Sequence, residues 1–139
     1  MNAIDTNVLI YCVDDTQLAK QAIADQLLDR LAVGTEPTVV PMQAAVEFLG
    51  CLRKWENAGR HPRDVTRFHF QWLLDSFPIV SASPDILEQS LELSSRYSLS
   101  HWDSLLLAAC LEAGVETLYS EDLQDGANYD SVRVVNPFA

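Results

Sequence analysis

The stretch MNAIDTNVLIY, residues 1–11, places a carboxylate, a hydroxyl and an amide between two apolar segments. Residues 2–5 are typical of a short strand, and the apolar run 8–11 continues as a turn or short helix. Burying the carboxylate of Asp5 at their junction is costly unless a positive charge lies beside it. The hydroxyl and amide that follow belong to residue types that cap helices, but one helix start does not need three of them. The stretch predicts a buried strand that ends at a functional acid.

Short strands and helices alternate along the rest of the chain. Further strands are expected at 38–41, 78–81, 116–120 and 132–135, and the polar segment 120–130 is expected to be a loop. Helices are expected at 16–32, 42–58, 62–77, 84–97 and 100–114, from apolar spacing and from Pro and Gly at their ends. Strands separated by helices indicate a parallel sheet with helices on both faces, an α/β sandwich.

Length and composition fit an ordinary globular chain. We expect residues 1–139 to form a single domain, with 48% hydrophobic and 21% charged residues. No apolar stretch approaches the ~20 residues that a membrane helix needs, and the first residues lack the features of a signal peptide. Cys12, Cys51 and Cys110 are widely spaced in apolar contexts, which predicts buried reduced thiols and a cytoplasmic location.

The charge is strongly acidic but unevenly placed. A formal net charge of −11 argues against a nucleic-acid partner, unless acidic residues hold divalent cations. Five of the nine basic residues fall within a short segment: Arg53, Lys54, Arg60, Arg63 and Arg67. This segment is interpreted either as a solvated face of two helices or as an edge that contacts phosphates.

Four acids are expected to meet at one edge of the sheet. Asp5 and Asp122 each follow a strand, and parallel strands deliver such residues to the edge where ligands collect. Glu47 lies early in the helix after the second strand, and Asp103 lies in the first turn of a late helix. Several carboxylates around one hollow are what Mg²⁺ or Mn²⁺ prefers.

Each acid alone also has a simpler explanation. Asp103 stands three residues after Ser100, as in a capping box. Glu47 fits the solvated face of an amphipathic helix, and Asp122 lies in a loop rich in turn-forming residues. Taken singly, the acids leave both interpretations open.

The motifs taken together resemble a known family. DTNVL (5–9), a Glu in the helix after the second strand, HWDSLLLAA (101–109) and YSEDLQDG (119–126) resemble the PIN-domain nucleases. The resemblance is closest to the VapC-type toxins of prokaryotic toxin–antitoxin pairs. It runs through essentially the whole chain, in the order and spacing of that family.

The resemblance implies a fold and a set of site residues. The fold is a PIN-like three-layer α/β/α sandwich with a short parallel sheet of four to five strands. The metal-binding and catalytic quartet is Asp5, Glu47, Asp103 and Asp122. Asn7, Thr6 and Ser120 are supporting residues, and the extra acids Glu121 and Asp125 leave open which side chains of the last loop bind metal.

The resemblance also implies an activity and partners. The expected activity is Mg²⁺- or Mn²⁺-dependent endoribonuclease, because metal ions activate water and neutralise a phosphodiester without a covalent intermediate. The expected partners are RNA, a cognate antitoxin and a second copy in a homodimer, with no membrane. From their position after Glu47, the basic residues expected to guide RNA are Arg53, Lys54, Arg60 and Arg63.

Two other functions were weighed against this interpretation. A catalytically silent PIN-like module that binds protein is the main alternative, and the intact quartet argues against it. A phosphatase of the haloacid dehalogenase type needs a second Asp two residues after the first, where this chain has Asn7. Neither a dinucleotide-binding glycine motif nor a P-loop is present.

Overall fold

The computed structural model describes all 139 residues and contains six helices and six strands. The helices are α1 (Thr6–Val13), α2 (Leu18–Val33), α3 (Met42–Asn57), α4 (Arg63–Ser76), α5 (Asp85–Tyr97) and α6 (His101–Ala113). The strands are β1 (Asn2–Ile4), β2 (Thr38–Pro41), β3 (Ile79–Val80), β4 (Thr117–Tyr119), β5 (Asn128–Tyr129) and β6 (Val132–Val135). Apart from β5, these elements match the expected ones to within about two residues at each end, which is the ordinary uncertainty of helix and strand boundaries.

The strands form one sheet in the order β3-β2-β1-β4-β6-β5. Every neighbouring pair is parallel except β5 and β6, which pair antiparallel. The class of fold expected from the sequence is therefore confirmed, but the sheet has six strands instead of four or five. The additional strand, β5, has only two residues and lies in the segment 120–130 that was expected to be a loop. Asp130, with φ of 52°, makes the tight turn that folds β5 back onto β6.

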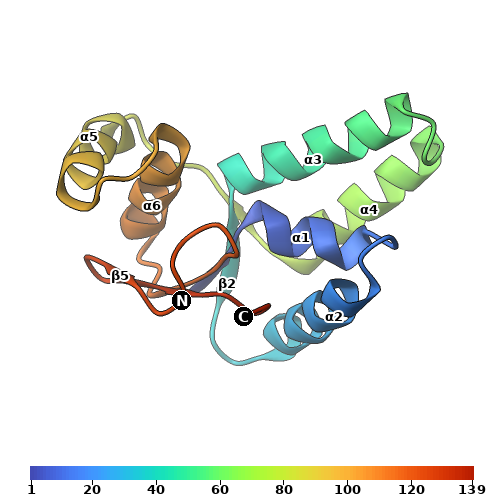
Figure 1. Ribbon diagram of the computed structural model, residues 1–139, viewed down its shortest axis with the longest axis horizontal. Helices are drawn as coiled ribbons and strands as arrows, with labels where there is room; N and C mark the ends of the chain where they lie inside the picture. Colours follow the sequence, from blue (N-terminus) through green and yellow to red (C-terminus); the bar gives the residue numbers. More distant parts are fainter.

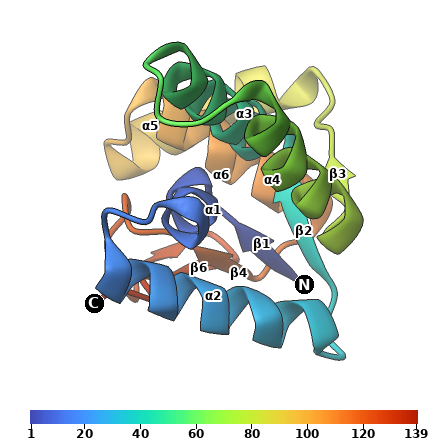
Figure 2. The same cartoon turned by 90° about the vertical axis from the view of Figure 1, so that its right-hand side faces the viewer.

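Helices cover both faces of the sheet, and the sheet separates two apolar cores. Neighbouring strand residues point to opposite faces: Ile4 packs with the first core and Ala3 with the second. The first core includes residues of α1, α2, α3 and α4, and the second includes residues of α5 and α6. Figures 1 and 2 show this division, with α5 and α6 on one side and the other four helices on the other. No helix is both long and apolar enough to cross a membrane.

The helix pair α3 and α4 forms an arm beside α1. Helix α3 contacts both α1 and α4, and Figure 2 shows α3 and α4 side by side above α1. The two helices are joined through Gly59, whose φ of 79° places it in the left-handed region that ends a helix. Gly114, with φ of 80°, ends α6 in the same way, as its position in the sequence predicts. All three cysteines are free, but only Cys110 is buried as expected, whereas Cys12 and Cys51 are half-buried.

Candidate active site

Asp5 lies at the carboxyl end of the central strand β1. Its backbone N–H donates to the carbonyl of Tyr119 on the neighbouring strand β4, at 3.0 Å. Its side chain caps α1, because Oδ1 accepts a hydrogen bond of 2.7 Å from the backbone N–H of Thr6. Its other oxygen, Oδ2, accepts a hydrogen bond of 2.6 Å from Ser120 Oγ. The side chain is held at both oxygens and is only 6% exposed.

Thr6 connects Asp5 to the predicted acid of α3. Its Oγ donates to Glu47 Oε2 at 2.8 Å, across 41 residues of sequence. The Thr6 side chain is buried, whereas Glu47 is exposed at the surface of α3. The supporting role that the resemblance implies for Thr6 stays a prediction, and this hydrogen bond is the contact through which Thr6 would act.

The loop after β4 brings Asp122 to the same edge of the sheet. Ser120 Oγ donates to Asp5 and also accepts a hydrogen bond from the backbone N–H of Asp122, at 3.2 Å. Asn7 Oδ1 accepts from the backbone N–H of Glu121, at 3.1 Å, and so ties the loop to α1. The Asn7 Nδ2 group is buried and has no hydrogen-bond partner, so this amide keeps a free donor beside the site.

The electrostatics of Asp5 reflect burial among other acids. Burial is the largest cause that raises its pKa, from 3.8 to about 6. The hydrogen bonds from Ser120 and Thr6 lower the pKa, whereas the negative charges of Asp122 and Glu47 raise it further. Glu47 and Asp122 are therefore each close enough to Asp5 to influence it electrostatically. A buried carboxylate under this influence is stabilised by a cation from outside the chain.

Asp103 is connected to the other acids only indirectly. Its backbone N–H donates to Ser100 Oγ at 3.2 Å, which is the capping contact expected from the sequence. Gln43 joins the start of α6 to α3, because its Nε2 donates to the carbonyl of Trp102 at 3.1 Å and to Glu47 Oε1 at 3.4 Å. Sequence reasoning assigned Gln43 no role, although its i, i+4 spacing to Glu47 was the available signal.

The donor set suits a hard divalent cation, but it is not gathered into a finished metal site. Carboxylate oxygens are the ligands that Mg²⁺ and Mn²⁺ favour. No group of three or more Asp, Glu, His or Cys side chains lies close enough together to hold a metal ion. The chemistry of the residues therefore fits such an ion, while their side chains would have to turn toward it.

The two additional acids of the last loop have other partners. Glu121 forms an ion pair with Lys20, whose Nζ also donates to Tyr11 Oη at 3.1 Å. Burial raises the pKa of Glu121, but hydrogen bonds from Lys20 and Tyr11 and the charge of Lys20 outweigh it, so this pKa is lower than usual. Asp125 Oδ1 accepts from the backbone N–H of Asn136 at 2.8 Å. Both acids are engaged within the fold, and sequence reasoning missed the parts played by Lys20 and Tyr11.

The structure divides the basic residues expected to contact RNA. Arg60 pairs with Asp14 at 3.3 Å and with Asp15 at 3.7 Å, and its guanidinium lies 3.9 Å from the centre of the Trp55 ring. Arg53 and Arg63 instead line a hollow between α3 and α4. Lys54 is exposed on α3 and takes part in no ion pair.

Solved structures with this fold come from several organisms. A toxin–antitoxin complex from Klebsiella pneumoniae has a chain 24% identical to this one, with a TM-score of 0.67, over 99% of this chain and 98% of that one. VapC20 from Mycobacterium tuberculosis, a sarcin–ricin loop cleaving toxin, is 17% identical, with a TM-score of 0.66, over 96% and 99% of the two chains. VapBC2 from Rickettsia felis, bound to a DNA fragment from its promoter, is 11% identical in sequence, with a TM-score of 0.68, over 96% of each chain.

The sequence itself identifies the family. No curated protein matches it closely enough to count as a relative. The family model described as PIN domain matches residues 3–124. That range includes DTNVL at the end of β1 and the loop that carries Asp122, the two segments that the structure brings together at one sheet edge. The chain belongs to the PIN domain family.

Proposed function

We propose that residues 1–139 act as a single-domain, metal-dependent endoribonuclease, and that the protein is the toxin of a VapBC-like toxin–antitoxin pair. The observation that carries this proposal is Asp5: a buried carboxylate whose pKa is raised to about 6 by burial and by neighbouring acids. Such an arrangement is costly for a structural residue, and it is expected where a cation must bind.

The proposed metal ligands are Asp5, Glu47, Asp103 and Asp122, and the proposed cofactor is Mg²⁺ or Mn²⁺. A divalent cation held there would lower the pKa of water and neutralise charge on a phosphodiester. Ser120 and Thr6 orient the carboxylates of Asp5 and Glu47 through their hydroxyl groups. We propose that the free donor on Asn7 Nδ2 binds an oxygen of the substrate or of a carboxylate that turns toward the cation.

The substrate and partners follow from the family and from the neighbouring structures. RNA is the proposed substrate because a solved neighbour is named as a sarcin–ricin loop cleaving toxin. An antitoxin partner is proposed because two other neighbours are a toxin–antitoxin complex and a VapBC pair. The net charge of −11 suits a basic antitoxin segment. A homodimer and a cytoplasmic location complete the proposal.

One observation favours the alternative, a silent PIN-like module that binds protein without cutting RNA. The acids are not gathered closely enough to hold a metal ion as they stand. Calorimetric titration with Mn²⁺ separates the two functions. The nuclease requires Mn²⁺ to bind the wild type and to bind the Asp5→Asn variant far more weakly, whereas the silent module predicts no difference between the proteins.

Cleavage of a pool of structured RNAs tests the proposal directly. The wild type is compared with Asp5→Asn, each with Mn²⁺ and with EDTA, and products are read by sequencing their ends. We expect discrete cuts with the wild type and Mn²⁺ alone. Cuts that persist in Asp5→Asn or in EDTA would show that the activity does not belong to this site.

A further inference from the structure

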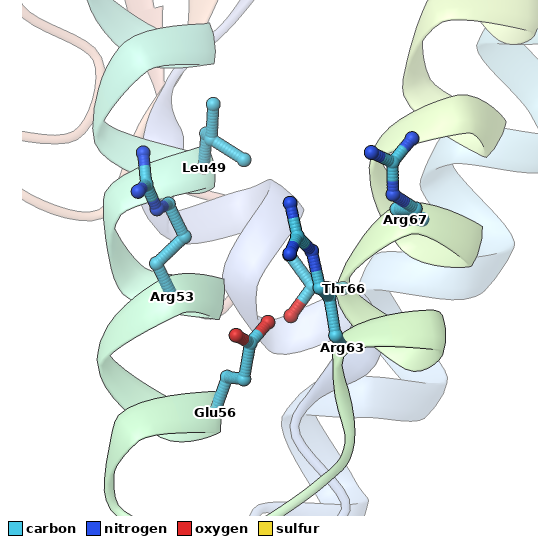
Figure 3. Close-up of a pocket in the computed structure, with 6 residues that line it drawn as sticks. All are labelled: Leu49, Arg53, Glu56, Arg63, Thr66 and Arg67. Atoms are coloured by element: carbon cyan, nitrogen blue, oxygen red, sulfur yellow. The ribbon is translucent and has the colours of Figure 1, made fainter.

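A hollow between α3 and α4 brings together arginines that have no acidic partner. Its volume is about 380 Å³, and it is lined by Leu49, Arg53, Glu56, Arg63, Thr66 and Arg67. Figure 3 shows Arg63 between the two helices, with Arg53 on the α3 side and Arg67 on the α4 side. None of these arginines takes part in an ion pair. Together with the single glutamate, they give the lining a net positive charge.

The charge of this hollow contrasts with that of the whole chain. Three of only nine basic residues line this hollow in a protein of net charge −11. Guanidinium groups that share a hollow repel one another unless an anion lies between them. One guanidinium can also donate two parallel hydrogen bonds to two oxygens of a phosphate. An acidic protein that binds RNA needs such a local basic site, because its overall field repels phosphate.

The candidate active site and the hollow each include a residue from the exposed face of α3, Glu47 in the site and Arg53 in the hollow. Glu47, Gly50 and Arg53 follow one another at intervals of three residues on α3, and all are exposed. At 1.5 Å per residue, the first and last are about 9 Å apart along the helix axis. An interval of three residues is a little less than one helical turn, so the three positions shift in the same direction around α3. Gly50 therefore lies between Glu47 and Arg53 on the helix surface.

Gly50 is not explained by the fold. It lies inside α3, where glycine is less favourable than alanine. A Cβ atom added there would meet no atom within 4 Å, so packing does not require a glycine at this position. A helical glycine on an exposed face lets another backbone approach closely. Gly50 therefore presents no side chain on the exposed face of α3 between Glu47 and Arg53.

We propose that the hollow formed by Arg53, Arg63 and Arg67 is an exosite that binds phosphates of an RNA strand after it crosses α3 at Gly50. This inference rests on the proposed function and adds a second contact to it, away from the acids. Arg67 belongs to the basic segment that the sequence analysis noted, but it was not among the four residues expected there to guide RNA. Arg60 is excluded, because acidic side chains already occupy its guanidinium.

Binding of a short fluorescein-labelled single-stranded RNA tests the exosite. The Asp5→Asn protein, with Mg²⁺ present, serves as a background that does not cut. The test variant adds Arg63→Gln and Arg67→Gln, and the matched control adds Arg30→Gln and Arg133→Gln, two exposed arginines that form no ion pair. Anisotropy is measured over a range of salt concentrations, and thermal melts confirm that all the proteins are folded.

We expect the exosite variant to bind RNA about tenfold more weakly than the background, and the control to change little. The slope of log K against log salt should fall in magnitude by about 1.4, since each lost phosphate contact removes about 0.7 for single strands. Equal losses in both double variants, or no loss in either, would overturn the exosite. Pyrophosphate is also titrated into the protein with the labelled RNA bound. If pyrophosphate binds the hollow without displacing the RNA, the hollow is a site for a free anion, and the proposal is overturned.

The Gly50→Gln variant tests the path between the two sites. Glutamine favours the helix more than glycine does and adds no charge, so the variant should melt at a higher temperature. It should nevertheless bind the labelled RNA several-fold more weakly, because the added side chain would stand in the proposed path of the strand. Unchanged RNA affinity would overturn the path across α3.

Parallel cleavage by the protein with Asp5 intact distinguishes failure of the exosite from failure of the proposed function. RNA that is cut normally, together with exosite variants that bind as the control does, would refute only the exosite. If RNA is neither cut nor bound, both proposals fail.

Discussion

The acids at the sheet edge and the arginines between α3 and α4 are both groups of like charge, but the fold treats them differently. Asp5 is buried, fixed by two hydrogen bonds, and close to two other acids. Arg53, Arg63 and Arg67 are exposed on helices and form no ion pair. The charged form of the buried Asp5 carboxylate therefore opposes folding. Water screens the exposed arginines, so their charges cost little.

This difference indicates how each region is expected to respond to mutation. Removing a charge from the buried region should change stability and activity in opposite directions. Removing a charge from the exposed region should change RNA affinity and leave stability within about 0.5 kcal/mol. The four predictions that follow test this contrast, from the largest expected effect to the smallest.

Asp5→Asn should abolish RNA cleavage and yet stabilise the metal-free protein. The amide can accept the hydrogen bond from Thr6 N–H and donate one to Ser120 Oγ, so both contacts of Asp5 are retained in a neutral group. Cleavage should fall by at least about 100-fold, because a metal ion contributes several kcal/mol to such a reaction. Denaturant unfolding in EDTA should show a gain in stability at neutral pH. A loss of stability would mean that the charge of Asp5 is already compensated within the fold.

The advantage of Asp5→Asn should depend on pH. The pKa of Asp5 is raised from 3.8 to about 6 in the folded protein, so this group favours the folded state of the wild type most where it is protonated. That contribution is present below pH 3.8 and is lost as the pH rises through about 6, with a limit of roughly 3 kcal/mol. The difference in unfolding free energy between the two proteins, measured in EDTA from pH 4 to 8, should therefore grow with pH. A difference that stays constant would place the titration elsewhere.

Sequence reasoning reached the framework of the site because strand ends are local features. Asp5 and Asp122 each follow a short strand, and parallel pairing of β1 and β4 brings them to the same edge. The fold class followed from the alternation of strands and helices in the same way. The two-residue strand β5 was missed, because so short a segment has no periodicity and forms only by pairing with β6.

Contacts between distant segments were beyond that reasoning. The hydrogen bond from Thr6 to Glu47 spans 41 residues and depends on how α1 packs against α3. The ion pair of Lys20 with Glu121 spans 101 residues, and the sequence shows neither partner beside the other. Arg67 lies in the basic segment, but its place in the hollow with Arg53 depends on the packing of α3 against α4.

Thr6→Val should lower both stability and cleavage by moderate amounts. The substitution keeps the branched shape but removes the hydroxyl that donates to Glu47 Oε2 at 2.8 Å. A lost hydrogen bond of this kind costs about 1 kcal/mol, and poorer positioning of Glu47 should slow cleavage about tenfold. Thr38→Val is the matched control, because Thr38 is also buried and accepts a hydrogen bond from Asn2 Nδ2 at 3.4 Å, away from the acids. Equal slowing in both variants would make the effect of Thr6 one of stability alone.

Glu121→Gln should have the smallest effect, although its charge is removed next to Asp122. Lys20 and Tyr11 already engage the Glu121 carboxylate and hold it on the α1 side of the loop. A group occupied by an ammonium is a poor ligand for a second cation, so cleavage with Mn²⁺ should stay within a few-fold of the wild type. Asp122→Asn should by contrast reduce cleavage about as strongly as Asp5→Asn. If Glu121→Gln were the more damaging of the two, the ligand from this loop would be Glu121, and Lys20 would have to release it when the metal binds.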